Sequence, residues 1–159
     1  MTFGWINLVN AAFVVDLITM SVLGQKKSGL PPMQSRRKLL NILEEIGRYA
    51  CMALMMLPLL PGFEFGFASS NAMVGWLVGS LVLLSSYTVL WTKAKRGGAV
   101  LYGLALVPAL LFLCCGVLLR HWALVAVAVL FGVSHTLVVR EHLQSERLCK
   151  SKKETRYDR

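Results

Sequence analysis

Two long runs of uncharged, mostly apolar residues constrain this chain more than any other feature. Residues 99–119 and 122–139 contain no charged side chains, and only Arg120 and His121 separate the two runs. A single helix through both would be about 60 Å long at 1.5 Å per residue, about twice the hydrocarbon thickness of a bilayer. The two runs therefore predict a tight hairpin of transmembrane helices.

Five segments have the length and composition of a membrane span, which needs roughly 20 mainly apolar residues. These spans are residues 3–24, 39–61, 70–92, 99–119 and 122–140, and residues 141–159 form a basic tail. The composition agrees, because 56% of the residues are hydrophobic and only 16% are charged, whereas soluble domains have about 25% charged residues. We therefore expect an all-α fold, a polytopic membrane bundle of five transmembrane helices in one domain.

Two local features refine this bundle: an amphipathic start to the second segment and a glycine pair in the third. Residues 36–48 alternate polar and apolar faces, so both a position in the membrane and a position on its surface fit them. Pro58 and Pro61 are expected to kink and then end this helix, because proline removes a backbone N–H. Gly75 and Gly79 favour close packing against another helix of the same chain.

The basic residues predict the orientation, because Lys and Arg in short loops stay on the cytoplasmic side. In a five-span arrangement, 15 of the 17 Lys and Arg residues fall on one side of the membrane. We therefore expect the N-terminus outside, the C-terminal tail in the cytoplasm and a location in the plasma membrane. The net charge of +9 then reflects orientation and attraction to an anionic inner leaflet. We expect no nucleic-acid partner, and recognition of an acidic lipid or protein by the tail is the alternative.

Ionisable side chains inside the spans are candidate functional residues, because charged groups are costly there. Counted at about 1.5 Å per residue, they all fall in the cytoplasmic half of the bilayer. Glu44 and Glu45 reach Arg48 at i,i+4 and i,i+3, and Asp16 is the expected partner of Arg48 across a helix interface. The sequence predicts a polar, cytoplasm-facing cavity whose ligand-binding residues are Asp16, Glu44, Glu45, Arg48, Tyr87 and His135.

A purely structural role is the alternative for each of these residues. Buried membrane charges also pair for packing, Glu44 and Glu45 fit a water-facing helix start, and Tyr87 and His135 fit hydrogen bonds between helices. The four cysteines form no C-x-x-C pair, so we predict no metal site and no cofactor. Nucleotide-binding loops and hydrolase motifs do not occur either, which favours a protein that is not an enzyme.

Three classes of function fit these features. We favour a permease-like protein or ligand-binding membrane subunit, whose charged cluster binds a small polar solute or ion. The second class is a non-catalytic accessory or regulatory membrane subunit that uses its basic tail. The third is a membrane-embedded enzyme acting on a lipid headgroup. Because five spans are a small scaffold for transport, we expect a homo-oligomer or a partner membrane subunit.

Overall fold

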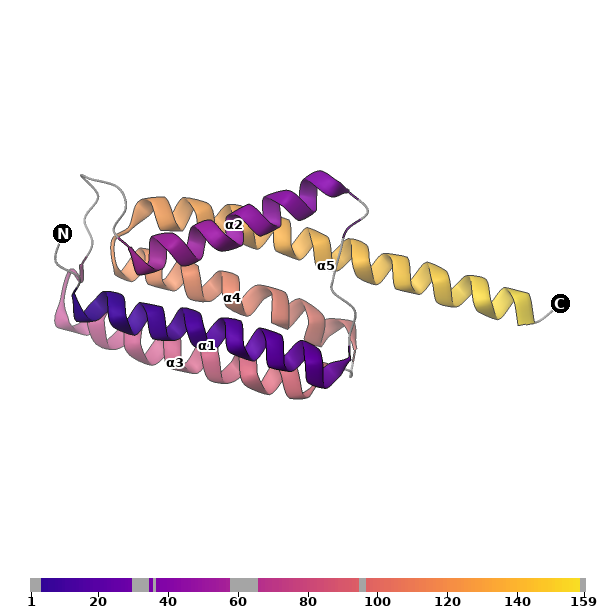
Figure 1. Ribbon diagram of the computed structural model, residues 1–159, viewed down its shortest axis with the longest axis horizontal. Helices are drawn as coiled ribbons and strands as arrows, with labels where there is room; N and C mark the ends of the chain where they lie inside the picture. The colour runs from indigo at the N-terminus through magenta and orange to yellow at the C-terminus, as the bar shows by residue number, and fades with distance from the viewer. Residues whose placement is uncertain (1–3, 30–34, 36, 58–65, 95–96, 158–159) are drawn as a thin grey trace.

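The computed structural model describes five helices that run alternately in opposite directions along one long axis (Figure 1). Residues are described over 4–29, 35, 37–57, 66–94 and 97–157, with side chains as far as residue 145. The helices are α1 (Trp5–Ser28), α2 (Lys38–Met56), α3 (Ser70–Thr92), α4 (Gly98–Leu118) and α5 (Trp122–Tyr157). The all-helical fold predicted from the sequence is confirmed.

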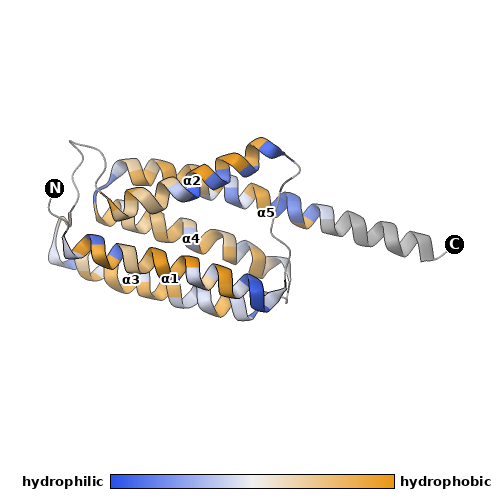
Figure 2. Ribbon diagram, viewed as in Figure 1, coloured by the Kyte–Doolittle hydropathy of each residue, from blue (hydrophilic) through white to orange (hydrophobic). Residues whose placement is uncertain are grey.

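Four helices of the described chain, α1, α3, α4 and the first part of α5, are long and apolar enough to cross a membrane. Most of their residues are hydrophobic (Figure 2), and large apolar side chains such as Val15, Val78 and Leu130 are more than half exposed. An apolar surface of this extent suits lipid rather than water, so the structure indicates an integral membrane protein. The exception is α2, which carries four charged residues among its 19.

Two helices end elsewhere than the sequence suggests. α2 ends at Met56, short of the expected residue 61, and Leu57 adopts an extended backbone with φ −126° and ψ 131°. A residue before proline is driven toward this conformation by the proline ring, which accounts for the end of α2 at Met56. Pro58 and Pro61 lie outside the described residues. α5 continues past residue 140, the expected end of the last span, to Tyr157, so residues 141–157 of the predicted tail are a helical extension of that span.

The central helix is α4, which packs between α3 and α5 (Figure 1). One side of it supplies much of the core, because buried residues recur along the helix at spacings of three and four: Leu101, Leu104, Ala105, Pro108, Ala109 and Phe112. Residues at this spacing share one face of a helix. Pro108 is the proline inside α4, where it contributes to the core.

α2 approaches α5 closely at a glycine that the sequence analysis did not select. A Cβ atom at Gly47 would lie 3.2 Å from Cβ and 3.3 Å from Cα of Phe131 on α5. A Cβ at Gly75, by contrast, would meet nothing within 4 Å. The expected intramolecular packing of the glycine pair is therefore wrong at Gly75, where the surface is open, but it occurs at Gly79, where a Cβ would lie 3.7 Å from Sγ of Cys114 on α4. Gly47 is the position that lets α2 and α5 approach each other.

Polar contacts fix α2 at both ends. Near its C-terminus, Asn10 on α1 donates a hydrogen bond from Nδ2 to the carbonyl oxygen of Met55 at 3.0 Å. Carbonyl groups in the last turn of a helix have no partner within it. At the other end, the Ser35 N–H donates to Asn41 Oδ1 at 2.9 Å, and Asn41 Nδ2 donates to the Ser35 carbonyl at 3.0 Å. The Ser35 hydroxyl donates to the carboxylate of Glu141 on α5, which ties this start to the bundle.

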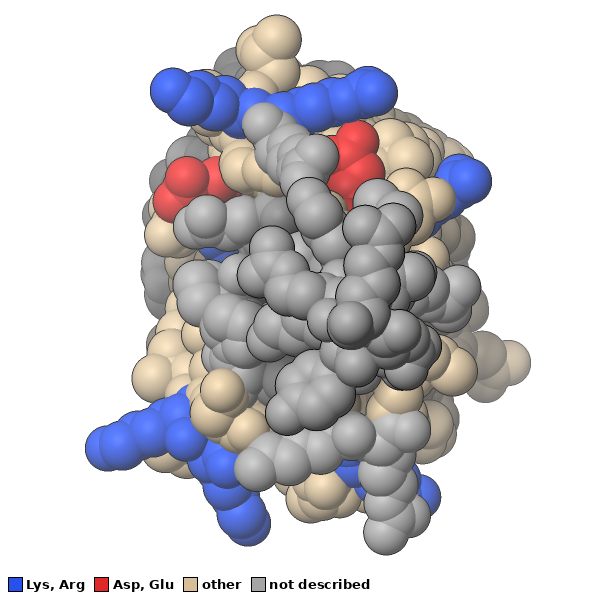
Figure 3. Space-filling view, turned by 90° about the vertical axis from the view of Figure 1, so that its right-hand side faces the viewer, with Lys and Arg blue, Asp and Glu red and all other residues tan. Residues whose placement is uncertain are grey.

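Exposed basic side chains gather at the end of the bundle from which α5 projects, and they lie around the edge of that end in Figure 3. They are Lys26, Lys27, Arg37, Lys38, Lys93 and Arg140. The opposite end instead holds a cluster of aromatic rings with centroids 5.2 to 6.4 Å apart, formed by Trp5, Phe13, Phe67 and Trp76. The two ends of the bundle therefore differ in chemistry.

Candidate functional site

One face of α2 carries the residues that the sequence analysis placed together. Glu44, Arg48, Cys51 and Met55 follow one another in steps of four, three and four, and Cys51 and Met55 are fully buried. Glu44 lies on the same face, about two turns closer to the start of the helix than Cys51. It points into the bundle, and only 12% of its side chain is exposed. Cys51 and Met55 therefore pack α2 against the other helices, and this packing places Glu44 inside the bundle.

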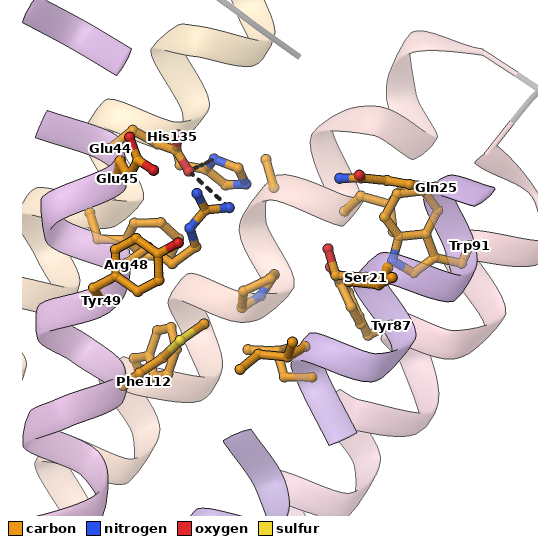
Figure 4. A pocket seen from close by; sticks show the side chains of 18 of the residues that line it. Ser21, Gln25, Glu44, Glu45, Arg48, Tyr49, Tyr87, Trp91, Phe112 and His135 are labelled. Atoms are coloured by element: carbon orange, nitrogen blue, oxygen red, sulfur yellow. Dashed lines mark ion pairs between the residues drawn. The ribbon is translucent and has the colours of Figure 1, made fainter. Parts of the chain in front are cut away.

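The Glu44 carboxylate lies between two nitrogen-bearing side chains. Its Oε1 atom is 3.2 Å from Nδ1 of His135 on α5 and 3.9 Å from Nη1 of Arg48 one turn along α2. Figure 4 marks both ion pairs. His135 is held by stacking on Phe131, with ring centroids 5.1 Å apart and an interplanar angle of 17°. The close approach of α2 and α5 at Gly47 brings these groups into contact.

These three side chains border a cavity of about 470 Å³ to which all five helices contribute. Ligand pockets in proteins commonly measure about 300 to 1,000 Å³. Across the cavity from Arg48, Figure 4 shows a second polar group on α1 and α3, consisting of Ser21, Gln25, Tyr87 and Trp91. The cavity therefore has two polar walls on different pairs of helices, and α4 lies between them.

Several polar atoms at the cavity have unused hydrogen-bonding capacity. Arg48 Nε, Glu44 Oε1 and His135 Nδ1 are each buried, and within the described chain none of them has a partner in hydrogen-bond geometry. The contacts of Glu44 are thus close charge contacts without full hydrogen-bond alignment. The indole nitrogen of Trp91 is also buried and also lacks a partner in ideal hydrogen-bond geometry within the described chain. Buried polar atoms are usually satisfied, so this arrangement is typical of a site that takes a further polar partner.

Five of the six residues predicted as ligand-binding line this cavity: Glu44, Glu45, Arg48, Tyr87 and His135. Glu45 lies at the exposed rim, while Tyr87 is buried. The sixth, Asp16, is half-buried on α1 and is not among the residues that line the cavity.

The expected ion pair between Asp16 and Arg48 does not occur among the described residues, where Arg48 lies near Glu44 instead. Helix geometry explains the difference. Ser21 faces the cavity from α1, and a residue five positions earlier points roughly 140° away around the helix axis. Asp16 therefore belongs to another face of α1.

Ser21, Gln25 and Trp91 line the cavity although the sequence analysis did not select them. All three lie in the last two turns of α1 or the last turn of α3. A signal was available for Gln25 and Ser21, which are polar residues four apart near the end of an apolar span and so share one face. Trp91 lies near the end of an apolar span, and its role as a wall of the cavity depends on the rotation of α3.

The described residues contain no group of three His, Cys, Asp or Glu side chains able to hold a metal ion. Cys51, Cys114 and Cys115 are free. A comparison with protein-family models, with curated proteins and with solved structures finds no match.

Proposed function

We propose that this protein is a ligand-binding integral membrane protein, either permease-like or a subunit of a larger membrane assembly. Its site is the cavity between α2 and α5 on one side and α1 and α3 on the other, and its ligand is a small polar solute or an ion. The observation that carries the proposal is the convergence of Glu44, Arg48 and His135 on a cavity of about 470 Å³. Ionisable groups within a membrane bundle mark ligand and ion pathways.

The proposal includes five spans, with α2 as the second. The 19 residues of α2 give a length of about 28 Å at 1.5 Å per residue, close to the hydrocarbon thickness of about 30 Å. Its Glu44 and Arg48 turn toward the cavity, which lowers the cost of carrying them through the bilayer. The alternating direction of the five helices (Figure 1) is consistent with this count.

The proposed orientation puts the N-terminus outside and the basic end in the cytoplasm, at the plasma membrane. It rests on the basic side chains around one end of the bundle (Figure 3) and on the retention of Lys and Arg in short loops on the cytoplasmic side. Glu44 and Arg48 lie nearer to this end, so the cavity faces the cytoplasm. We expect Cys149 to react with a membrane-impermeant thiol reagent only after the cell is permeabilised. Reaction in intact cells would reverse the orientation.

The test of ligand binding is mass spectrometry of small molecules that co-purify with the protein in native-like membranes. We expect a species that is bound to the wild-type protein and lost from Arg48→Gln. Arg140→Gln is the matched control, since Arg140 is exposed on α5 and removal of its charge leaves the cavity intact. Equal recovery of every co-purified molecule from the two variants would contradict a ligand site at Arg48.

An accessory role in a larger assembly is the second candidate, and α5 is the observation in its favour. This helix continues to Tyr157 and projects well beyond the other four (Figure 1). A chain truncated after residue 145 distinguishes the two roles. If the projecting helix only binds a partner, truncation removes co-purifying proteins and leaves small-molecule binding unchanged. If truncation abolishes small-molecule binding, the projecting part of α5 is required for ligand binding, and partner binding is not a separate role.

A further inference from the structure

The cavity has a polar half and an apolar half that follow one another along the bundle. The polar half contains Glu44 and His135. The apolar half lies farther from the basic end and begins with Met52, about two turns past Glu44 on α2, and Phe131, about one turn from His135 on α5. Phe112 continues the apolar wall on α4, and Figure 4 shows it on the far side of Arg48 from Glu44. A molecule that fills both halves must itself have a polar and an apolar end.

The mouth of the cavity lies along the flanks of α1 and α2. On α1 the lining residues Ile18 and Val22 are 44% and 59% exposed, and Tyr49 on α2 is 59% exposed. α1 is long and apolar enough to cross a membrane, so these exposed side chains lie at hydrocarbon depth. Nearer the basic end, Gln25 and Glu45 are exposed at the same mouth. The opening therefore extends from the membrane surface into the acyl-chain region.

The polar atoms with unused capacity are mainly donors. Arg48 has five N–H groups and no acceptor function, and an indole nitrogen only donates. Among the described residues, Glu44 is the one carboxylate within ion-pair distance of Arg48, at 3.9 Å, and His135 shares it at 3.2 Å, while Glu45 lines the cavity at its exposed rim. Arg48 Nε is buried without an acceptor in hydrogen-bond geometry among the described residues, and Trp91 Nε1 is buried there with only the Tyr87 side chain as an interaction partner, outside ideal hydrogen-bond geometry. Guanidinium groups match carboxylate and phosphate oxygens in geometry and charge.

We propose that the cavity binds an anionic amphiphile, with its carboxylate or phosphate headgroup on Arg48 and its alkyl chain between Met52, Phe112 and Phe131. The amphiphile moves in sideways from the cytoplasmic leaflet, between α1 and α2. Its headgroup remains near the membrane surface and its chain points toward the midplane, as both do in the leaflet. This inference rests on the proposed ligand-binding function and narrows the ligand from a polar solute to a lipid-like anion.

The test uses the protein in phosphatidylcholine vesicles and a dodecyl phosphate probe with bromine atoms on the chain carbons near the headgroup. Bromine quenches tryptophan fluorescence on contact, and Trp91 lines the cavity. The difference between the wild-type protein and Trp91→Phe isolates the Trp91 signal. Three competitors are then added: unbrominated dodecyl phosphate, dodecyltrimethylammonium at the same mole fraction in the lipid, and inorganic phosphate.

We expect saturable quenching that dodecyl phosphate displaces and the other two competitors do not. Arg48→Gln should raise the Kd of the probe roughly 10- to 100-fold, the loss typical of hydrogen bonds to a charged group. Arg140→Gln should leave the Kd unchanged. Ser21→Phe, which fills the cavity without removing charge, should abolish saturable quenching. Thr19→Phe is its control, because Thr19 is exposed on the same helix and does not line the cavity.

The contrary outcomes separate this inference from the proposed function. One such outcome is that inorganic phosphate displaces the probe as effectively as dodecyl phosphate does, in a manner that depends on Arg48. This result would support a site for a small polar anion and would contradict binding of an amphiphile. Equal displacement by dodecyltrimethylammonium would overturn the anionic headgroup. Absence of saturable quenching together with no Arg48-dependent binding of phosphate would overturn both. Circular dichroism of each variant in the same vesicles must match the wild-type spectrum.

Discussion

Replacing Asn10 should loosen α2 from the bundle by a predictable amount. The Asn10 side chain is fully buried, and its Nδ2 atom donates to the Met55 carbonyl at 3.0 Å. Asn10→Ala removes this donor and leaves a buried carbonyl oxygen without it. An unsatisfied buried group costs about 1–3 kcal/mol, and hydrogen bonds between membrane helices average about 0.6 kcal/mol. We therefore expect a loss of about 1–2 kcal/mol in the free energy of unfolding.

The assay is equilibrium unfolding in mixed micelles, in which the helix signal is followed as the fraction of denaturing detergent rises. Asn10→Leu preserves most of the side-chain volume without a donor, so it should lose about as much stability as Asn10→Ala if the hydrogen bond dominates. Asn71→Ala is the control, because Asn71 is exposed in the first turn of α3. If Asn10→Ala and Asn71→Ala differ by less than about 0.5 kcal/mol, the range typical of surface substitutions, the capping argument is refuted.

Two further predictions concern helix packing and pH. Gly47→Val should cost about 1–3 kcal/mol by overpacking against Phe131, whereas Gly75→Val, with nothing within 4 Å of its Cβ, should be nearly neutral in the same unfolding assay. His121, just outside the spans, accepts from the Leu124 N–H at Nδ1 at 3.2 Å, and burial lowers its pKa. The folded state therefore binds fewer protons than the unfolded state, and stability should fall as the pH drops through about 6.5, the pKa of an unfolded histidine. His121→Asn, a neutral N-cap, should flatten this pH profile, and an unchanged profile would contradict the assignment.

The helices themselves could be predicted from the sequence because membrane spans impose a strong requirement on length and charge. The hairpin of α4 and α5 follows from two apolar runs separated by Arg120 and His121, and the structure turns at that point with Arg120 in a left-handed conformation (φ 58°). The end of α2 was missed, although Leu57 precedes a proline and the restriction on such residues is general. The restriction acts on the residue before the proline, so the helix ends one residue earlier than Leu57, at Met56.

The candidate site could be predicted only where one helix carries its own polar face. Glu44 and Arg48 are on the same side of α2 by spacing alone, and the structure places them as expected. Asp16 and Ser21 lie on α1, which is apolar nearly all the way round, so its sequence does not indicate which face turns inward. That rotation depends on packing with other helices, and it decides that Ser21, and not Asp16, lines the cavity.

The most direct measurement is the reactivity of a cysteine placed on the cavity wall. Ser21→Cys and Thr19→Cys are made with Cys114 and Cys149 replaced, since Cys51 and Cys115 are fully buried. A charged, membrane-impermeant thiol reagent is then applied from the side that carries the C-terminus. A polar cavity open to that side predicts rapid labelling of Ser21→Cys and little labelling of the lipid-facing Thr19→Cys. Labelling of neither variant, or equal labelling of both, would contradict a polar cavity at this position.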